Sequence, residues 1–214
     1  LSTENTSFGT GFSLGLTHFN NRTNLLELSN GEKYRVIPGT DTVRNKKLDN
    51  FRFAYTNGTD DADGYTVFWK EGKQEILSVR EDNTNFEVTT IISPLGRVMN
   101  LSWDWSGQYA RLAQVSDETT LLCRFTYGIF STLTVWPGTP EERQIIFELI
   151  DSDSRLDVLR MQVSSAETLY WYFHYDLVGP QNAYYLTGID YPTGKQDRVV
   201  YNQVEGFKFP NAAG

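Results

Sequence analysis

The chain has 214 residues, which is enough for one large domain or two small ones with a sizeable core. Hydrophobic residues make up 39% of it and aromatic residues 14%, a composition that excludes a disordered or low-complexity protein. Nineteen Lys and Arg residues against 27 Asp and Glu residues give a net charge of -8, and no basic stripe is present, so we expect no nucleic-acid partner.

Composition also excludes a disulfide scaffold, a thiolate metal centre and a membrane span. Cys123 is the only cysteine, so the chain can form neither an internal disulfide nor a thiolate metal centre. Its apolar runs are a few residues long, whereas a membrane helix needs about 20, and we expect no membrane span. The N-terminus has no signal-peptide pattern and does not begin with Met, so we expect a trimmed or processed chain whose cellular address cannot be read.

Turn-forming dipeptides divide the N-terminal half into short β-strands. Thr, Val, Ile and aromatic residues are abundant and Ala is scarce, a balance that favours strands over helices. Asn30-Gly31, Asn57-Gly58, Asp63-Gly64 and Glu71-Gly72 are flanked by short segments in which apolar residues alternate with polar ones. This pattern predicts hairpins in series, each burying one face.

Residues 139–151 admit a helix and a strand interpretation. Thr139 is a candidate N-cap and Pro140 suits the first helical turn. However, residues 144–150 are rich in Ile and Phe, and a turn-like cluster at 151–154 precedes a new alternation from Leu156 onward. We therefore expect strand, hairpin and strand in this segment. Since no flexible linker divides the chain, we also expect one β domain over residues 1–214.

An internal repeat appears when the chain is compared with itself at an offset of 98 residues. The matched positions are Val88, Ile91, Pro94, Gly96 and Trp103 in one copy and Leu186, Ile189, Pro192, Gly194 and Tyr201 in the other. Asp104 and Asn202 follow the two aromatic residues. The pattern predicts a strand, a Pro-x-Gly turn and a second strand ending in an aromatic residue, because Pro presets φ and Gly accepts a positive one.

The first copy resembles one unit of the RHS or YD-repeat family. The resemblance rests on Pro94-Leu95-Gly96-Arg97, Trp103-Asp104 with Gly107 three residues on, and Arg111-Leu112, with Trp103 in place of the usual Tyr. A degenerate copy covers Tyr175-Asp176, Pro192-Thr193-Gly194 and Tyr201-Asn202. Residues 11–16 and 25–36 are similar to the segment that precedes the repeats in such proteins.

The resemblance implies a long antiparallel sheet spiralling into a hollow shell, as in the B and C components of bacterial Tc toxins and in animal teneurins. We therefore expect an all-β fold of antiparallel hairpins in series that form a large curled sheet, of β-solenoid or open-barrel character. Residues 1–85 are expected to form pre-repeat hairpins, and residues 86–214 two degenerate repeats. The chain has too few repeats to close a shell, so we expect a fragment or a small outlier.

Sequence patterns give no catalytic, cofactor or metal site. Residues 60–64 (Asp-Asp-Ala-Asp-Gly) resemble a calcium loop but lack its first and last ligands, and Arg155 interrupts Asp151, Asp153 and Asp157. Cys123 is expected to be an apolar filler, and neither His18 nor His174 lies in a catalytic motif. The many carboxylates leave a glycoside hydrolase as a third, weaker interpretation, because a sequence does not give the carboxylate spacing.

Aromatic residues of one strand suggest the sole ligand surface. Tyr170 and Tyr172 share one strand face and Trp171 lies on the other, so only one of these faces can join the core. Exposed aromatic rows stack against sugar rings, yet aromatic pairs also simply stabilise sheets, which is the interpretation we favour.

The expected function is a non-catalytic structural segment of an RHS or YD-repeat protein, building a β-shell or scaffold for a secreted toxin or cell-surface effector. Its partners would be other repeats or domains of a longer chain, and its location, by resemblance, secreted or at the cell surface. Pro94, Gly96, Arg97, Trp103, Asp104, Gly107, Pro192, Gly194 and Tyr201 would be structural. The alternative is a carbohydrate-binding module that uses Tyr170, Trp171 and Tyr172.

Overall fold

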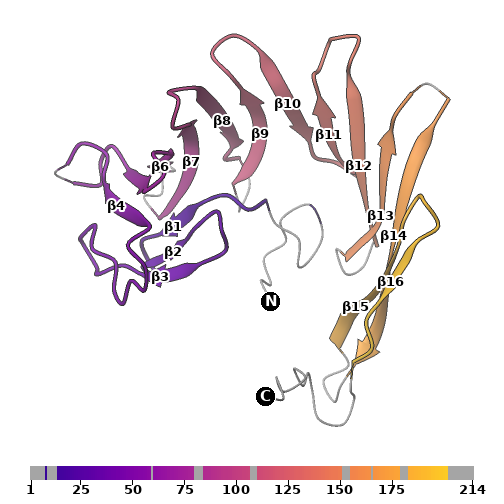
Figure 1. Ribbon diagram of the computed structural model, residues 1–214, viewed down its shortest axis with the longest axis horizontal. Helices are drawn as coiled ribbons and strands as arrows, with labels where there is room; N and C mark the ends of the chain where they lie inside the picture. Colours follow the sequence, from indigo (N-terminus) through magenta and orange to yellow (C-terminus); the bar gives the residue numbers. More distant parts are fainter. Residues whose placement is uncertain are drawn as a thin grey trace. The chain divides into compact units, whose positions relative to one another are not determined.

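The structure is a computed structural model that describes residues 8, 14–58, 60–79, 84–106, 110–150, 155–164, 166–178 and 183–201. Its regular elements are sixteen antiparallel β-strands, and the described residues form no helix (Figure 1). The all-β antiparallel fold is therefore confirmed. The chain forms two compact units, Ser13–Phe125 with Val135–Thr139, and Leu1–Phe12 with Thr126–Thr134 and Pro140–Gly214. We call them the first-half unit and the second-half unit and describe each by itself.

Strands β1 to β10 belong to the first-half unit and run in hairpins. Their bounds are β1 His18–Asn20, β2 Leu25–Glu27, β3 Lys33–Arg35, β4 Phe51–Tyr55, β5 Tyr65–Trp69, β6 Gln74–Val79, β7 Asn85–Ile92, β8 Val98–Asp104, β9 Arg111–Ser116 and β10 Leu121–Thr126. β6 pairs with β7 along residues 86–92. On the opposite edge of β7, β1 pairs with residues 85–87 and β8 with residues 90–92. The sheet therefore forks at β7.

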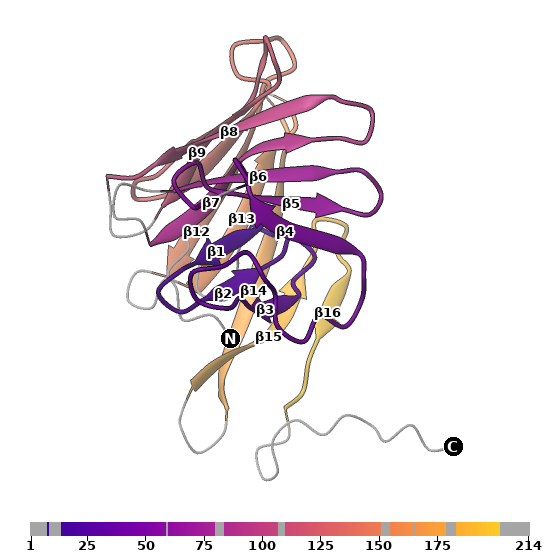
Figure 2. The ribbon, with the colours of Figure 1, turned by 90° about the vertical axis from the view of Figure 1, so that its left-hand side faces the viewer.

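The fork lets β1–β3 fold onto β4–β5 and enclose an aromatic core (Figure 2). The ring of Phe19 lies 5.2 Å from that of Phe53 and 4.9 Å from that of Tyr65, and Tyr34 lies 5.2 Å from Phe51. These side chains are 8% exposed or less. Such burial removes large apolar areas from water and holds the two layers together.

A buried polar network joins the same layers. The carboxylate of Glu75 on β6, 2% exposed, accepts hydrogen bonds from the hydroxyls of Thr17 and Ser29 and lies 3.0 Å from Lys73 Nζ. Lys73 Nζ also lies 4.4 Å from the ring centroid of Trp69. Because each oxygen of the carboxylate has a partner, the network offsets the cost of burying its charge.

One hairpin turn occurs four times among the described residues. In each, the N–H of the first residue donates to the carbonyl four positions on, and the N–H of a glycine donates back to the carbonyl of the first residue. The turns are Leu28–Glu32, Trp69–Lys73, Ser93–Arg97 and Tyr191–Lys195, with glycine φ angles of 85, 95, 78 and 81°. The turns predicted at Asn30-Gly31, Glu71-Gly72 and the two Pro-x-Gly sites are confirmed. Asn57-Gly58 and Asp63-Gly64 instead both lie within the β4–β5 connection.

Strands β11 to β16 follow, and β12 to β16 make up most of the second-half unit. Their bounds are β11 Ser131–Val135, β12 Arg143–Ile150, β13 Arg155–Gln162, β14 Thr168–Val178, β15 Ala183–Asp190 and β16 Gln196–Arg198. β12 and β13 pair along residues 145–150 and 155–161. The prediction of two strands joined as a hairpin is therefore confirmed, and the alternative helix is not formed. Thr139, the candidate cap, instead donates its hydroxyl to the carbonyl of Trp136 in a turn.

Burial is sparse in the second-half unit. Among its described hydrophobic residues, Phe8 and Leu156 are buried, whereas the side chains of β12 are almost all half-buried. Phe8 packs edge-on against Phe147, with ring centroids 5.0 Å apart. This sheet keeps much of its apolar surface accessible, which leaves room for a covering layer. The expected division of the chain into pre-repeat hairpins (residues 1–85) and two repeats (residues 86–214) stays a prediction.

Candidate functional site

The two copies of the repeat have the same strand pairing around their turns. β7 and β8 pair over residues 90–92 and 98–100, and β15 and β16 pair over residues 188–190 and 196–198. Every partner is shifted by the same offset of 98 found in the sequence. Pro94, Gly96 and Arg97 lie in the first turn, and Pro192 and Gly194 in the second. Gly107 and Asn202 lie outside the described residues, as do Gly11 to Ser13.

The repeat aromatics make the same long-range hydrogen bond. Trp103 Nε1 donates to the carbonyl of Val88 at 2.8 Å, and the Tyr201 hydroxyl donates to the carbonyl of Leu186 at 3.0 Å, in each case fifteen residues back. Both carbonyls lie just beyond the end of the strand pairing, so the aromatic residue satisfies a group that the ladder leaves over. Trp103 and Tyr201 therefore have equivalent roles in the two copies.

A one-residue β-bulge accompanies each of these carbonyls. Thr89 is the extra residue where β7 pairs with β6, and Thr187 where β15 pairs with β14. The Thr89 hydroxyl donates to the carbonyl of Ile76 at 3.4 Å, and the Thr187 hydroxyl to that of His174 at 3.2 Å. The repeat thus spans three strands, β6–β8 and β14–β16. This threonine match at the same offset was readable in the sequence and was missed.

A third site has the same design but a longer hairpin. Asp157 is the extra residue where β13 pairs with β12, and the Tyr175 hydroxyl donates to the carbonyl of Leu156 at 2.9 Å, nineteen residues back. Burial raises the pKa of Tyr175 to about 12. The aromatic-Asp pair Tyr175-Asp176 therefore has the same place relative to its bulge as Trp103-Asp104, although β14 continues beyond it to Val178. Sequence spacing concealed this copy because its strands are longer.

The aspartate after the first aromatic contacts the backbone two residues on. The Asp104 carboxylate accepts a hydrogen bond from the N–H of Ser106 at 2.9 Å. Hydrogen bonds from the side chain and backbone of Ser106 lower the pKa of Asp104. An aspartate in this position therefore orients the chain where it leaves β8.

One face of β14 presents the predicted aromatic surface. Tyr170 and Tyr172 are 40% and 46% exposed, and their rings are nearly parallel, 12° apart in plane, with centroids separated by 6.1 Å. Trp171 lies on the opposite face, half-buried and paired with Leu159. Tyr170 and Tyr172 therefore form the accessible pair, and Trp171 does not join them.

Charged groups continue this face beside the tyrosines. His174 Nε2 lies 3.0 Å from one oxygen of Asp190, and Arg198 Nη2 lies 2.6 Å from the other. The hydrogen bond from Arg198 is the main reason that the pKa of Asp190 is lowered. A Cβ at Gly188 would lie 2.7 Å from Arg198 Nη1, so this glycine gives the arginine room to cross β15. We call Tyr170, Tyr172, His174, Asp190 and Arg198 the tyrosine face.

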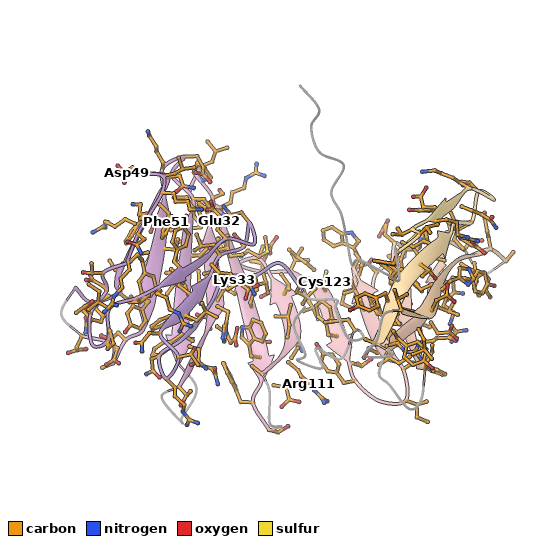
Figure 3. All side chains as sticks on the ribbon, turned by 90° about the horizontal axis from the view of Figure 1, so that it is seen from below. Glu32, Lys33, Asp49, Phe51, Arg111 and Cys123 are labelled. Carbon is orange, nitrogen blue, oxygen red and sulfur yellow. The ribbon has the colours of Figure 1, made fainter. Side chains whose placement is uncertain are left out.

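The other candidates have ordinary structural surroundings. Cys123 is half-buried on β10, and burial raises the pKa of its thiol. Figure 3 shows Cys123 apart from Arg111 of β9. His18 lies 2.8 Å from Glu87, across the β1–β7 pair. Asp60 accepts a hydrogen bond from the N–H of Ala62 at 3.0 Å, as expected of a turn. Asp151 and Asp153 lie outside the described residues.

Comparison with known proteins assigns no family. No protein-family model matches the chain, and no curated protein sequence matches it. Among the described residues, no helix is both long and apolar enough to cross a membrane.

Proposed function

We propose that the chain is a non-catalytic structural segment of an RHS or YD-repeat protein, building a β-shell or scaffold for a secreted toxin or cell-surface effector. The observation that supports this is the bulge-and-aromatic pattern, in which Trp103, Tyr175 and Tyr201 each donate to a carbonyl beside a one-residue bulge. A repeated backbone device that needs three adjacent strands is a means of extending a sheet.

The accessible apolar surface of the second-half unit also favours a scaffold. Tyr184 and Leu177 are each 47% exposed, and the edge strand β16 pairs only with β15 among the described strands. An exposed edge and apolar side chains usually receive a covering element or a further strand. In a longer repeat protein, neighbouring repeats and an enclosed domain would supply both.

The size of the native product tests this proposal. An antibody raised against the 214-residue chain, used with peptide mass spectrometry on the source cells, would identify the full polypeptide. We expect a much longer product that contains further Pro-x-Gly turns followed by aromatic-Asp pairs. A product of about 214 residues would contradict the scaffold proposal.

The tyrosine face supports a second candidate, carbohydrate binding. Two exposed, nearly parallel rings offer a flat stacking surface for sugar rings, and the Asp190 and Arg198 side chains beside them can accept and donate hydrogen bonds to hydroxyls. A scaffold alone does not require exposed rings next to a hydrogen-bonding group.

Glycan-array binding tests this candidate. Tyr170→Ala with Tyr172→Ala should abolish any binding, whereas Tyr184→Ala, a tyrosine of similar exposure on the opposite face, should preserve it. Retention of binding by the double variant would remove the tyrosine face as the site. The absence of binding by the parent chain would remove the candidate itself.

A further inference from the structure

An open cavity of about 590 Å³ lies along β3 and the loop that follows it, in the first-half unit. Four basic residues line it, Lys33 and Arg35 from β3 and Arg44 and Lys47 from the loop, and no lining residue is acidic. In a chain with a net charge of -8, this is a local concentration of positive charge. The volume lies within the range typical of small-molecule sites.

Backbone pairing brings two of these arginines opposite each other. Val36 and Val43 form an antiparallel bridge, and the N–H of Arg44 donates to the carbonyl of Arg35 at 2.7 Å. Arg35 and Arg44 therefore occupy facing positions on neighbouring segments. Like charges in facing positions destabilise a sheet, so this arrangement has a cost that a bound anion would remove.

The basic side chains differ in how far they are already neutralised. Lys33 Nζ lies 2.8 Å from Glu27, and Arg35 Nη1 donates to the carbonyl of Thr23, which orients its guanidinium. Within the described part of the chain, the side chains of Arg44 and Lys47 make no ion pair or hydrogen bond. Two exposed cations and one oriented guanidinium are therefore available to a ligand.

Two asparagines add amide groups to the polar lining. Asn24 and Asn45 have φ angles of 53 and 51°, in the left-handed region that non-glycine residues seldom adopt. Both line the cavity, and their side-chain amides can donate hydrogen bonds to an oxyanion. Such backbone conformations are frequent where a binding site requires a sharp change of direction.

We propose that this cavity binds a phosphate or sulfate group of a small, sugar-sized ligand. Arg35 and Arg44 supply paired N–H donors, which match the oxygens of a tetrahedral anion, and Lys47 supplies a further charge. The volume exceeds what a single tetrahedral anion needs, so the remaining space accommodates the group that it esterifies.

Calorimetric titration of the chain tests the proposal, with inorganic pyrophosphate and sulfate as probes and chloride at matched ionic strength as the reference. Glucose 6-phosphate and glucose 6-sulfate then distinguish the two ester types. We expect pyrophosphate to bind, and Arg44→Ser with Lys47→Ser to weaken binding by about tenfold or more, since hydrogen bonds to charged groups are strong. Lys70→Ser, which removes an exposed lysine elsewhere in this unit, should leave the affinity unchanged.

Thermal unfolding without ligand provides an independent measurement. The double variant should be at least as stable as the parent, because it removes like charges, and this rules out misfolding as the cause of lost binding. Equal effects of pyrophosphate and chloride, or equal losses in the Lys70→Ser variant, would overturn the proposal. So would binding of a Glu-rich peptide where both esters and both inorganic anions fail.

Discussion

Replacement of Gly96 by Ala isolates the backbone cost of the repeated turn. Gly96 has a φ of 78°, and a Cβ at this position would have no heavy atom within 4 Å. An L-residue in the left-handed region costs roughly 1–2 kcal/mol, so Gly96→Ala should lower the free energy of unfolding by about 1 kcal/mol. Gly96→Asn should recover part of this loss, because Asn tolerates positive φ better than Ala.

Gly64 provides a contrast within the same compact unit. Its φ of 84° is similar, but a Cβ there would lie only 2.0 Å from the carbonyl oxygen of Leu77. Rotation of a side chain cannot relieve a clash with backbone, so the strand has to shift. Gly64→Ala should therefore lower the free energy of unfolding by roughly 2–4 kcal/mol, and Gly64→Asn should recover none of it.

Urea unfolding followed by tryptophan fluorescence measures both series, because Trp69 and Trp103 lie in this unit. The midpoint should move with little change in slope if the native state keeps its buried area. Equal losses for Gly96→Ala and Gly64→Ala would refute the separation of backbone strain from steric clash. Recovery by Asn at position 64 but not at position 96 would refute it equally.

Six further substitutions test the polar contacts. In urea unfolding, Trp103→Phe and Tyr201→Phe should each lower the free energy of unfolding by about 1 kcal/mol. Each substitution removes the donor of a hydrogen bond to a carbonyl fifteen residues back. Glu75→Ala should cost roughly 3 kcal/mol or more in the same assay, and Glu75→Gln less, since Ala removes both carboxylate oxygens, and with them the ion pair to Lys73, from a buried network. The raised pKa of Tyr175, about 12, shows that the folded state favours the neutral hydroxyl. The contribution of this tyrosine to stability is therefore complete below pH 10 and is lost as the pH rises through 12. In a titration of stability against pH, Tyr175→Phe should reduce this alkaline loss. The lowered pKa of Asp190 has the opposite effect on the pH dependence of stability. The stabilisation by this carboxylate is present above the ordinary aspartate pKa and is lost as the pH falls through the lowered value. Arg198→Gln should reduce this loss of stability in acid.

Turns were the most predictable feature of the fold because their chemistry is local. A glycine at the fourth position of each repeated turn requires positive φ, and the residues that flank the turn alternate in polarity. The strand at residues 143–150 was predictable for a related reason, since its run of Ile and Phe favours a β conformation over the competing cap at Thr139.

Bulges were not predictable, because no residue type marks them. Thr89 and Thr187 share a hydroxyl contact, but Asp157 is the extra residue at the third site and Ala113 where β9 pairs with β8. What these positions share is their place in the pairing of two strands, which a single sequence does not contain. The fork at β7 was hidden for the same reason.

The two candidate binding surfaces also differ in how far the sequence predicts them. Alternation along β14 was enough to place Tyr170 and Tyr172 on one face, and the structure adds their exposure and the charged groups from β15 and β16. The cavity along β3 was not predicted, because Arg35 and Arg44 become neighbours only through a bridge between strand and loop. A basic cluster made by folding leaves no run of basic residues in the sequence.

The bulges and aromatic donors together define a cooperative unit larger than a hairpin. A bulge adds one residue to one strand of a pair, which bends that strand and increases its twist, and it leaves nearby backbone groups without a ladder partner. Trp103 and Tyr175 satisfy those groups from the strand on the other side, and Tyr201 does so from the segment that follows β16. Each of these three bulged strands therefore depends on both sides of its pairing, since one neighbour defines the bulge and the donor comes from the other side. Removal of strands from the C-terminal end of such a sheet should weaken the hairpin before the cut as well as the strands removed, because the preceding bulge loses its donor.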